Sequence, residues 1–435
     1  MEIELKRDLI EACRPDEAIG PDDRRHYDFD HPTQLRGSPW RDRLAEVIEL
    51  SRQPTAQLVT GLRGSGKTTE LRQLDKVLSE RGHCVIMADV GRWISNERAI
   101  TTTDLMLATV LAVYPRGQPE TKSGWLDEYK EQLANFLFSK VKLDGKYGEG
   151  AASMVVGLTT DETVFQRAAD QLRKLDGLRD EIHGLLARAA SRSLAEGRRL
   201  ILLLDGAEKR ALGLGDISDA NRSLALHSAW FDAFTIEAIN LRPPVDVIYT
   251  VPPFMIRRSA QLAAAFGQEL EFLPMIRVYE RSGRRYAPGI EAVAQALFRR
   301  VPQGLFADPA IPRWLVSRCG GYFRDLLRFV TEMIYRVGDA PIFTREIAEA
   351  AVGRIQQQYF EALVAEEKQI LAELHPSKRF PDEEAARLRM DALLQEFKMV
   401  RYHNGDPWFD AHPLCWPAID AGGDLPTWED IESLP

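Results

Sequence analysis

Cysteines and long apolar runs are both scarce in this chain of 435 residues. The four cysteines, Cys13, Cys84, Cys319 and Cys415, lie far apart and lack the spacing of metal ligands. This pattern predicts buried free thiols and argues against a disulfide framework or a zinc site. No apolar run approaches the roughly 20 residues that span a bilayer, and the charged start of the chain is unlike a secretion signal. We therefore expect a cytoplasmic protein with no membrane partner.

An excess of basic charge is also missing. The formal net charge is −9, and this value weakly disfavours a whole-surface affinity for nucleic acid, although a local basic patch stays open. The chain is 45% hydrophobic and 28% charged, as is ordinary for a soluble globular protein. Its length predicts two or three domains with a large buried core.

The most informative segment is a phosphate-binding loop, GLRGSGKT, at residues 61–68. Its glycines permit a tight turn that points backbone N–H groups at phosphates, and the helical stretch 69–81 after it favours the anion. Lys67 is expected to reach the β- and γ-phosphates of ATP, and Thr68 to ligate Mg²⁺. The predicted phosphate contacts are Gly61, Arg63, Gly64, Ser65, Gly66, Lys67, Thr68 and Thr69.

A second nucleotide landmark is the apolar run 200–204, which ends in Asp205. Such a run is typical of a buried parallel strand that carries an acid at its carboxyl end. Because the chain also contains a phosphate-binding loop, Asp205 is predicted to be the Walker B acid, which holds Mg²⁺ through water.

Further apolar runs predict a parallel sheet of five strands with helices on both faces, hence an α/β P-loop fold. Besides the strand before the loop and the strand ending at Asp205, these runs are 84–88, 245–251 and 270–278. Ligands of such sheets bind at the carboxyl ends of the strands, where Thr250 is expected to orient the attacking water or touch the γ-phosphate. A threonine chosen for strand propensity is the alternative.

The segment 317–328 contains a glycine pair followed, after a short spacer, by Arg-Asp-Leu-Leu-Arg. It resembles the sensor-2 helix of AAA+ ATPases, especially replication-initiator ATPases and STAND signalling ATPases. The resemblance implies an ASCE/AAA+-like P-loop NTPase in which Arg324 leans from a helical lid onto the γ-phosphate. An ordinary surface arginine is the alternative. The resemblance also implies that residues 28–38, with Leu35, Arg36 and Gly37, pack on the adenine, unless they serve structural packing.

The C-terminal part predicts three short helices and a hairpin around an Asn-Gly turn. These elements are expected at 366–374, 383–389, 390–397 and 399–409. Three helices and a hairpin are typical of a winged helix, which binds DNA in replication initiators and clamps the nucleotide in STAND proteins. Residues 410–414 resemble the Met-His-Asp motif of STAND proteins, which implies that His412 faces the β-phosphate of ADP. A packed or solvent-exposed histidine is the alternative.

Two departures from the AAA+ pattern affect hydrolysis. Gly206 stands where these proteins usually carry a glutamate as general base, so Glu208 is the available carboxylate. Glu208 would polarise the attacking water if the turn bends it back, and otherwise hydrolysis would be slow. Arg257 and Arg258 lie at the beginning of a helix near whose end an arginine finger is expected, so their assignment as fingers is speculative.

About a hundred residues, 91–197, separate the second and third strands along the chain, which exceeds a normal crossover. Helices are predicted at 103–114, 125–138 and 166–194, and a hairpin or mobile loop at 139–160. This insertion is predicted to be a partner or effector surface, with scaffolding as the alternative. The predicted domains are an N-terminal flank 1–50, an ATPase core 51–285, a helical lid 286–360, and a winged helix with a C-terminal tail 361–435.

The favoured function is a STAND-like ATPase switch that exchanges ADP for ATP and then exposes a partner surface. By fold-level analogy, the setting is bacterial conflict or antiviral defence. The expected partners are an effector or sensor acting in trans, and further copies of the chain. The alternative is a DNA-binding initiator or transposition regulator, but acidic residues surround Arg387 and Arg389, the candidate DNA contacts. A small-molecule kinase fits poorly, because a lid and a winged helix have no obvious role in binding its acceptor.

Overall fold

The computed structural model describes residues 1–31, 35–94, 98–114, 124–143, 147–212, 220–338, 342–380, 384–419 and 425–434, without the side chains of 210–212, 220–223 and 384–388. Contacts divide the chain into two units. Unit 1 comprises Met1–Trp40, Gly61–Thr69 and Leu273–Pro435, and unit 2 comprises Arg41–Thr60 and Glu70–Phe272. None of the helices within the described ranges combines the length and apolarity of a membrane span.

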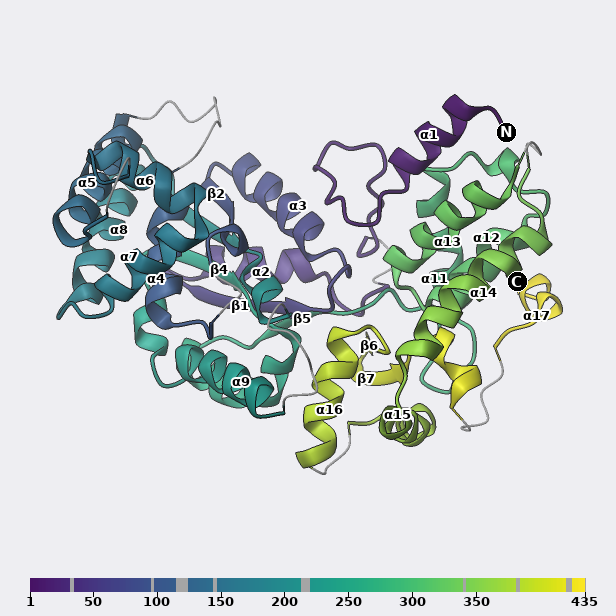
Figure 1. Cartoon of the computed structure of the whole chain (residues 1–435). Helices are drawn as coiled ribbons and strands as arrows, with labels where there is room; N and C mark the ends of the chain where they lie inside the picture. Colours follow the sequence, from purple (N-terminus) through teal and green to yellow (C-terminus); the bar gives the residue numbers. More distant parts are fainter. Residues whose placement is uncertain are drawn as a thin grey trace. The chain divides into compact units, whose positions relative to one another are not determined.

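A five-stranded sheet of order β2-β3-β4-β1-β5 forms the core of the predicted α/β fold (Figure 1). Its strands are β1 (Ala56–Gly61), β2 (Cys84–Asp89), β3 (Leu200–Asp205), β4 (Asp246–Thr250) and β5 (Glu271–Leu273). The pairings of β2 with β3, of β3 with β4 and of β4 with β1 are parallel. All residues of β1, β3 and β4 are buried, as expected for strands covered on both faces. The five predicted strands are confirmed.

The last strand is shorter than the predicted 270–278, because β5 ends at Leu273. Pro274 follows, and a proline lacks the N–H that a strand would donate to its neighbour. The next residues pair elsewhere in unit 1: Met275 donates to the Arg401 carbonyl oxygen at 2.9 Å, and Arg277 to that of Leu35 at 3.1 Å. The apolar run 270–278 thus contributes a short strand to the sheet and then hydrogen-bonds to other segments of unit 1.

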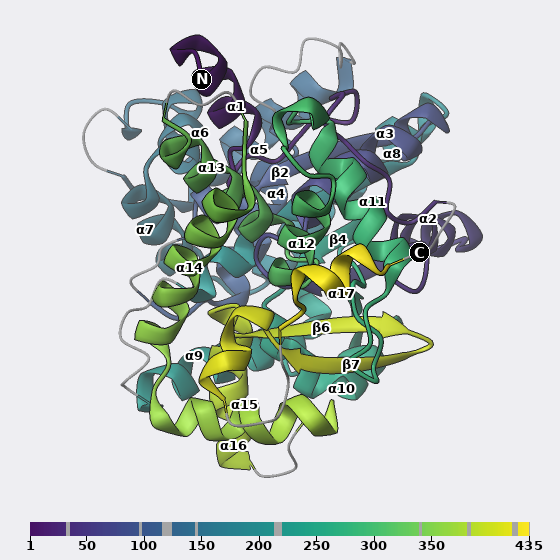
Figure 2. The same ribbon diagram turned by 90° about the vertical axis from the view of Figure 1, so that its right-hand side faces the viewer.

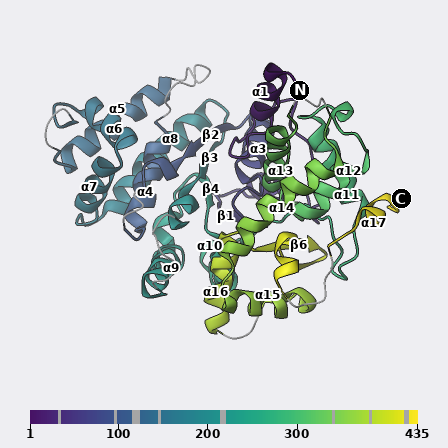
Figure 3. The same ribbon diagram turned by 45° about the vertical axis from the view of Figure 1, so that its right-hand side comes forward.

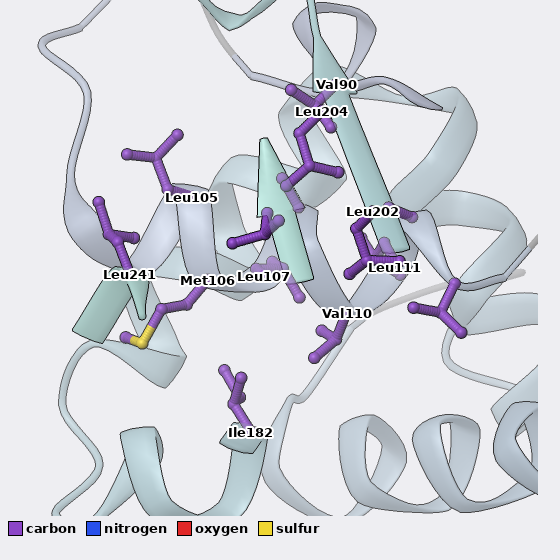
Figure 4. Close-up of a cluster of buried hydrophobic side chains, with 14 of the residues drawn as sticks. Val90, Leu105, Met106, Leu107, Val110, Leu111, Ile182, Leu202, Leu204 and Leu241 are labelled. Carbon is purple, nitrogen blue, oxygen red and sulfur yellow. The ribbon is translucent and has the colours of Figure 1, made fainter. Parts of the chain in front are cut away.

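The helices that lie wholly or mostly in unit 2 are α2 (Trp40–Leu50), α3 (Lys67–Glu80), α4 (Thr102–Ala112), α5 (Gly124–Lys140), α6 (Ala151–Thr160), α7 (Glu162–Leu172), α8 (Leu178–Ala195), α9 (Ala220–Phe234) and α10 (Ser259–Phe266). Every residue of α4 is buried, including its three threonines and Asp104, so this helix belongs to the core on all sides. Figure 4 shows Leu202 and Leu204 of β3 among side chains of α4, with Ile182 of α8 nearby.

Two predictions for the insertion were wrong. The segment 139–160 is no hairpin, because 151–160 forms α6, in which Gly157 lets the Tyr147 ring approach so closely that a Cβ would lie 2.8 Å from it. The predicted helix 166–194 is two helices, since Gly177 at φ +72° precedes α8. Figures 1 and 3 show α5 and α6 at the outer side of unit 2, away from its strands.

Unit 1 contains a group of helices and a hairpin (Figure 2). The elements are α1 (Ile3–Ala12), α11 (Ala287–Phe298), α12 (Ala310–Cys319), α13 (Phe323–Arg336), α14 (Arg345–Ala362), α15 (Ala365–Ser377), α16 (Glu384–Gln395), β6 (Met399–Asn404), β7 (Asp406–Ala411) and α17 (Trp428–Glu432). The helix α13 is strongly amphipathic, and its buried face includes Leu326, Phe329 and Val330. The predicted lid, 286–360, thus consists of helices, and its role as a lid stays a prediction.

The C-terminal hairpin is confirmed, and the helix count before it is corrected. β6 and β7 pair antiparallel across Gly405, which has φ +97° and permits the tight turn. The two predicted helices 383–389 and 390–397 are one helix, α16, because the stretch 384–395 contains no glycine or proline that would break it. Two helices, α15 and α16, therefore precede the hairpin directly.

Candidate nucleotide-binding site

The phosphate-binding loop lies between β1 and α3, as the strand–loop–helix pattern predicts. Lys67 is buried, and its ammonium donates to the carbonyl oxygens of Gly61 at 2.9 Å and Leu62 at 3.1 Å. These bonds hold the side chain back over the loop that precedes it. Its cation is thereby kept where the phosphates of a nucleotide are expected.

Gly64 of this loop lies against the start of α13, within unit 1. A Cβ at Gly64 would be 2.8 Å from Arg324 Nε and 3.0 Å from the Tyr322 hydroxyl oxygen, and the residue has φ +81°. Only glycine satisfies both conditions. The structure thus brings Arg324 to the phosphate-binding loop, where the sensor-2 resemblance placed it.

The glycine pair between α12 and α13 makes this approach possible. Gly320 and Gly321 have φ +58° and +77°, and a Cβ at Gly321 would overlap the carbonyl oxygen of Ile276. The turn directs the two following residues of interest, Tyr322 and Arg324, to one point of the loop. Tyr322 was missed by sequence reasoning, although its position directly after the glycine pair was an available signal.

Arg36 supports the loop from the N-terminal flank. Its guanidinium is buried, donates to the carbonyl oxygen of Ser65 at 3.3 Å, and lies 5.4 Å from the centre of the Phe29 ring. Asp30 Oδ1 lies 4.0 Å from Arg36 Nη1. Arg36 therefore contacts the backbone of the phosphate-binding loop, while its predicted role at the adenine stays a prediction.

The neighbours of Arg36 pack inside unit 1. Leu35 is fully buried, and a Cβ at Gly37 would lie 2.5 Å from His403 Nδ1 of β6. The N-terminal flank therefore packs directly against the C-terminal hairpin. Gln34, which the prediction included in this flank, lies outside the described residues.

His412 is fully buried directly after β7. Its Nδ1 accepts a hydrogen bond from the backbone N–H of Leu414 at 3.2 Å, and its Nε2 lies 3.5 Å from Asp325 Oδ2. The ring stacks on Tyr359 at 4.9 Å and meets Tyr322 edge-on at 6.1 Å. Burial lowers the pKa of His412 to about 4, and this effect outweighs the attraction of the Asp325 carboxylate. His412 and Gly64 thus share Tyr322 as a neighbour.

In unit 2, Asp205 ends β3 and is 1% exposed. It pairs in register with Asp89, the last residue of β2, and the Lys209 ammonium lies 3.9 Å from Asp205 Oδ2 and 3.5 Å from Asp89 Oδ2. Buried carboxylate oxygens suit Mg²⁺, which prefers oxygen ligands and keeps several of its waters. The Asp205 carboxylate therefore has the donor chemistry of a Mg²⁺ ligand, while its predicted role together with Thr68 stays a prediction.

Thr250 and Glu208 form a hydrogen-bonded pair next to Asp205. The Thr250 hydroxyl donates to Glu208 Oε2 at 2.6 Å and accepts from the backbone N–H of Gly206 at 2.9 Å. Thr250 is 1% and Glu208 7% exposed. The turn after β3 therefore does bend Glu208 back to the end of β4, as a role at the strand ends requires.

Arg257 and Arg258 lie at the end of a short 3-10 helix, Pro253–Arg258, that precedes α10. Both guanidinium groups lie over the Phe231 ring, at 5.6 Å and 5.2 Å from its centre. Arg257 also lies 3.3 Å from Nδ1 of His227. Their positions assign no arginine finger.

No protein-family model and no curated protein matches this chain. Among solved structures, a Walker-type ATPase of Pyrococcus abyssi is similar at 14% identity and a TM-score of 0.39, over 86% of this chain and 93% of that chain. The ORC2 protein of Aeropyrum pernix, in ADPNP–ADP complexes, is similar at 11% identity and a TM-score of 0.36, over 86% of this chain and 88% of that chain.

The fold itself follows from the chain's own geometry. The phosphate-binding loop leaves the carboxyl end of β1, Thr250 ends the neighbouring strand β4, and Asp205 ends the strand after that. Ligands of parallel α/β sheets bind at this edge. With this sheet order and these residues at the strand ends, the chain has the α/β fold of a P-loop NTPase.

Proposed function

We propose that this protein is an AAA+-like ATPase that acts as a nucleotide-dependent switch. The observation that carries the proposal is the contact of Arg324 and Tyr322, at the start of α13, with Gly64 of the phosphate-binding loop. A helix that contacts the loop from a distant part of the chain would make different contacts when a triphosphate is bound than when a diphosphate is bound. Such differential contacts are what a ligand needs to shift a conformational equilibrium.

The residues of the site divide into binding and hydrolytic groups. Lys67 neutralises charge on the β- and γ-phosphates, and the loop's N–H groups bind phosphate oxygens. Thr68 and Asp205 would hold Mg²⁺, which neutralises charge that develops on the phosphates. Glu208 accepts the Thr250 hydroxyl proton in a hydrogen bond, so this pair is suited to orient a water molecule.

Slow hydrolysis is part of the proposal. Gly206 provides no carboxylate directly after Asp205, and Glu208 reaches the strand ends only through a turn. Glu208 also accepts the hydrogen bond from Thr250, so it would have to bind the attacking water while it keeps that bond. The protein would therefore remain in the ATP-bound state for a long time, as a switch requires.

The switch would act through unit 1. Arg324 would favour the triphosphate state, and His412 would favour the diphosphate state in the manner of STAND ATPases. His412 is buried among Tyr322, Tyr359 and Asp325, so contact with a phosphate would require this cluster to open. A partner acting in trans would then bind the newly exposed surface. A role in conflict or antiviral defence remains a prediction from the resemblance.

The test is nucleotide binding and turnover, measured with oligomeric state by size-exclusion chromatography with light scattering. Lys67→Ala should abolish ATP binding, whereas Asp205→Asn should retain binding and lose Mg²⁺-dependent hydrolysis. Asp127→Asn, which removes one partner of the exposed Lys130–Asp127 pair, is the matched control. Wild-type protein that binds neither ATP nor ADP would refute the proposal.

A separate titration with duplex DNA tests the DNA-binding alternative. The Arg389 guanidinium pairs with Glu366 at 3.0 Å, so this candidate DNA contact is neutralised within unit 1. The side chain of Arg387 lies outside the described part of the chain. A salt-dependent affinity for duplex DNA that Arg389→Glu removes would replace the protein-partner switch with a DNA-binding ATPase.

A further inference from the structure

Tyr322 carries a buried hydroxyl that has no hydrogen-bond partner among the residues that the structure describes. The residue is 1% exposed, and its oxygen lies 3.0 Å from the position of a Cβ on Gly64. Burial raises the pKa of the Tyr322 phenol far above its ordinary value, so the group is neutral and able to donate at physiological pH. An unpaired buried hydroxyl destabilises the folded protein. A hydroxyl kept at this cost next to a phosphate-binding loop indicates a ligand.

A second unpaired donor faces the same point. Arg324 Nε is buried, lacks a hydrogen-bond partner within the described ranges, and lies 2.8 Å from the same Cβ position on Gly64. Ser65 Oγ, in the loop itself, is also buried without a partner among the described residues, and it lies 3.1 Å from the Cβ position on Gly61. Two donors that face one glycine, with no acceptor in the described part of the protein, call for an anion with several acceptor oxygens. A phosphate group has this chemistry.

The position of the two donors selects which phosphate they bind. The loop's own N–H groups take the α- and β-phosphates, and Lys67 reaches the β- and γ-phosphates. Tyr322 and Arg324 belong to another element and approach the loop at Gly64 from outside. The oxygens left for them are those of the outermost phosphate.

We propose that the Tyr322 hydroxyl is a binding residue for the γ-phosphate of ATP and donates to it beside Arg324. This proposal rests on the proposed function and adds a specificity-determining residue to it. Loss of the γ-phosphate in ADP removes the acceptor. Tyr322 therefore distinguishes ATP from ADP, and a phenylalanine at this position would not.

The same ring contacts the C-terminal elements. It stacks on Phe397 at 5.0 Å with an interplanar angle of 18°, and Phe397 is a non-glycine residue with φ +63°. A bulky residue in this left-handed conformation is strained and persists only where its surroundings hold it. Because Phe397 directly precedes Lys398 and β6, a movement of Tyr322 on phosphate binding reaches the hairpin through this stack.

The experiment uses the full chain and compares Tyr322→Phe with the wild type. This change removes only the hydroxyl and retains the ring that stacks on Phe397. Affinities for ATPγS and for ADP, each with Mg²⁺, are measured by isothermal titration calorimetry. A hydrogen bond to a charged group contributes about 1.5–3 kcal/mol, so the affinity for ATPγS should fall about tenfold or more, and the affinity for ADP about twofold or less.

Tyr279→Phe is the matched control. Its hydroxyl is also buried in unit 1 but donates to the carbonyl oxygen of Ser317 at 2.8 Å. This variant should lose thermal stability and retain both nucleotide affinities. Tyr322→Phe should behave in the opposite way: its melting temperature without nucleotide should equal or exceed that of the wild type, because an unpaired hydroxyl is removed.

Two results would overturn the role of Tyr322. An unchanged ATPγS affinity would show that the hydroxyl does not bind the phosphate, and an equal loss for ATPγS and ADP would show that it does not select the γ-phosphate. Wild-type protein that binds neither nucleotide would instead refute the proposed function. The two failures are therefore distinguishable in one set of titrations.

Discussion

Gly206 and Asp89 are so close that position 206 excludes any side chain: a Cβ on Gly206 would overlap Asp89 Oδ1, and the residue has φ +89°. Gly91 adds a second restriction, because its own Cβ would overlap the Gly206 carbonyl oxygen. The residue after Asp205 is therefore a glycine for steric reasons. The usual glutamate cannot occupy this place while Asp89 lies beside it.

We therefore expect Gly206→Ala to destabilise the protein by more than the cost of the backbone conformation alone. Gly82 provides the matched control, since it has the same φ of +89° and no atom within 4 Å of its Cβ position. Gly82→Ala should cost about 1–2 kcal/mol, and Gly206→Ala about 2 kcal/mol more, as measured by urea denaturation. Asp89→Ala in the Gly206→Ala background should recover part of the difference. Equal costs for the two glycine variants would contradict the steric explanation.

The Thr250–Glu208 pair should matter for hydrolysis rather than for binding. Glu208→Gln keeps the hydrogen bond from Thr250 but removes the negative charge, so the rate of ATP hydrolysis should fall by about 10²–10⁴-fold if Glu208 is the base. Thr250→Val should lower the rate at least about tenfold, because it leaves Glu208 and the N–H of Gly206 without this partner. Turnover is measured by phosphate release at saturating ATP.

Thr109→Val is the control for this series. Its hydroxyl is also buried, but it donates to the carbonyl oxygen of Leu105 within α4 and lies 3.3 Å from the Tyr249 hydroxyl, so it makes neither of the hydrogen bonds that join Thr250 to Glu208 and Gly206. It should reduce stability without a specific effect on turnover. Full activity in Glu208→Gln would assign the base to another residue and remove Glu208 from the hydrolytic group.

An ion pair between the half-buried Arg199 and the buried Asp246, at the amino-terminal ends of β3 and β4, should contribute strongly to the stability of the sheet. Arg199 pairs with Asp246, which is 1% exposed, and also donates to the carbonyl oxygens of Ile48 and Ser51, each at 2.8 Å. Arg199→Met should cost about 3–5 kcal/mol, because it leaves a buried carboxylate without its partner. The measurement is the free energy of unfolding from urea denaturation.

The control for this prediction is a pair at the surface of unit 2. Arg192 and Glu128 lie 3.2 Å apart, with side chains 62% and 45% exposed. Arg192→Met should change the free energy of unfolding by about 1 kcal/mol or less, because solvent screens exposed pairs. A cost for Arg199→Met as small as this would mean that the network contributes little.

Acid should destabilise unit 1 through His412. Its pKa is about 4 in the folded protein against 6.5 for an unperturbed histidine, so the unfolded chain takes up the proton at higher pH. The stabilising contribution is thus fully present above pH 6.5 and is lost as the pH falls toward 4. Burial likewise lowers the pKa of His227 to about 4, so His227 also makes unit 2 less stable as the pH falls toward 4.

The magnitude for His412 is roughly 3 kcal/mol over this pH range. The test compares urea denaturation at pH 7.5, 6.5, 5.5 and 4.5 for the wild type and His412→Gln. The variant should be less stable at pH 7.5 and should show a smaller loss on acidification. An identical pH dependence in both proteins would show that other groups govern the acid response.

Local patterns predicted the elements that carry their own signals. The run 200–204 before Asp205 is buried along its length as β3, and the glycine pair at Gly320 and Gly321 precedes a helix with Arg324 at the loop. The helix α6 was not predicted. Its Gly157 permits a close contact with Tyr147, and no local sequence pattern reveals this contact. The end of β5 at Leu273 was also missed, although Pro274 was a usable sign.

The sequence by itself determined the chemistry of the site. A glycine-rich loop with Lys67 and Thr68 predicts phosphate binding, and an apolar run ending in Asp205 predicts a buried strand, because backbone turns and hydrophobic periodicity are local properties. Only the tertiary structure decided which residues meet. Gly206 faces Asp89, Glu208 pairs with Thr250, and Tyr322 reaches Gly64, since each contact joins segments far apart along the chain. Such contacts form only in the closely packed fold, so a local sequence pattern does not predict which distant residue a side chain contacts.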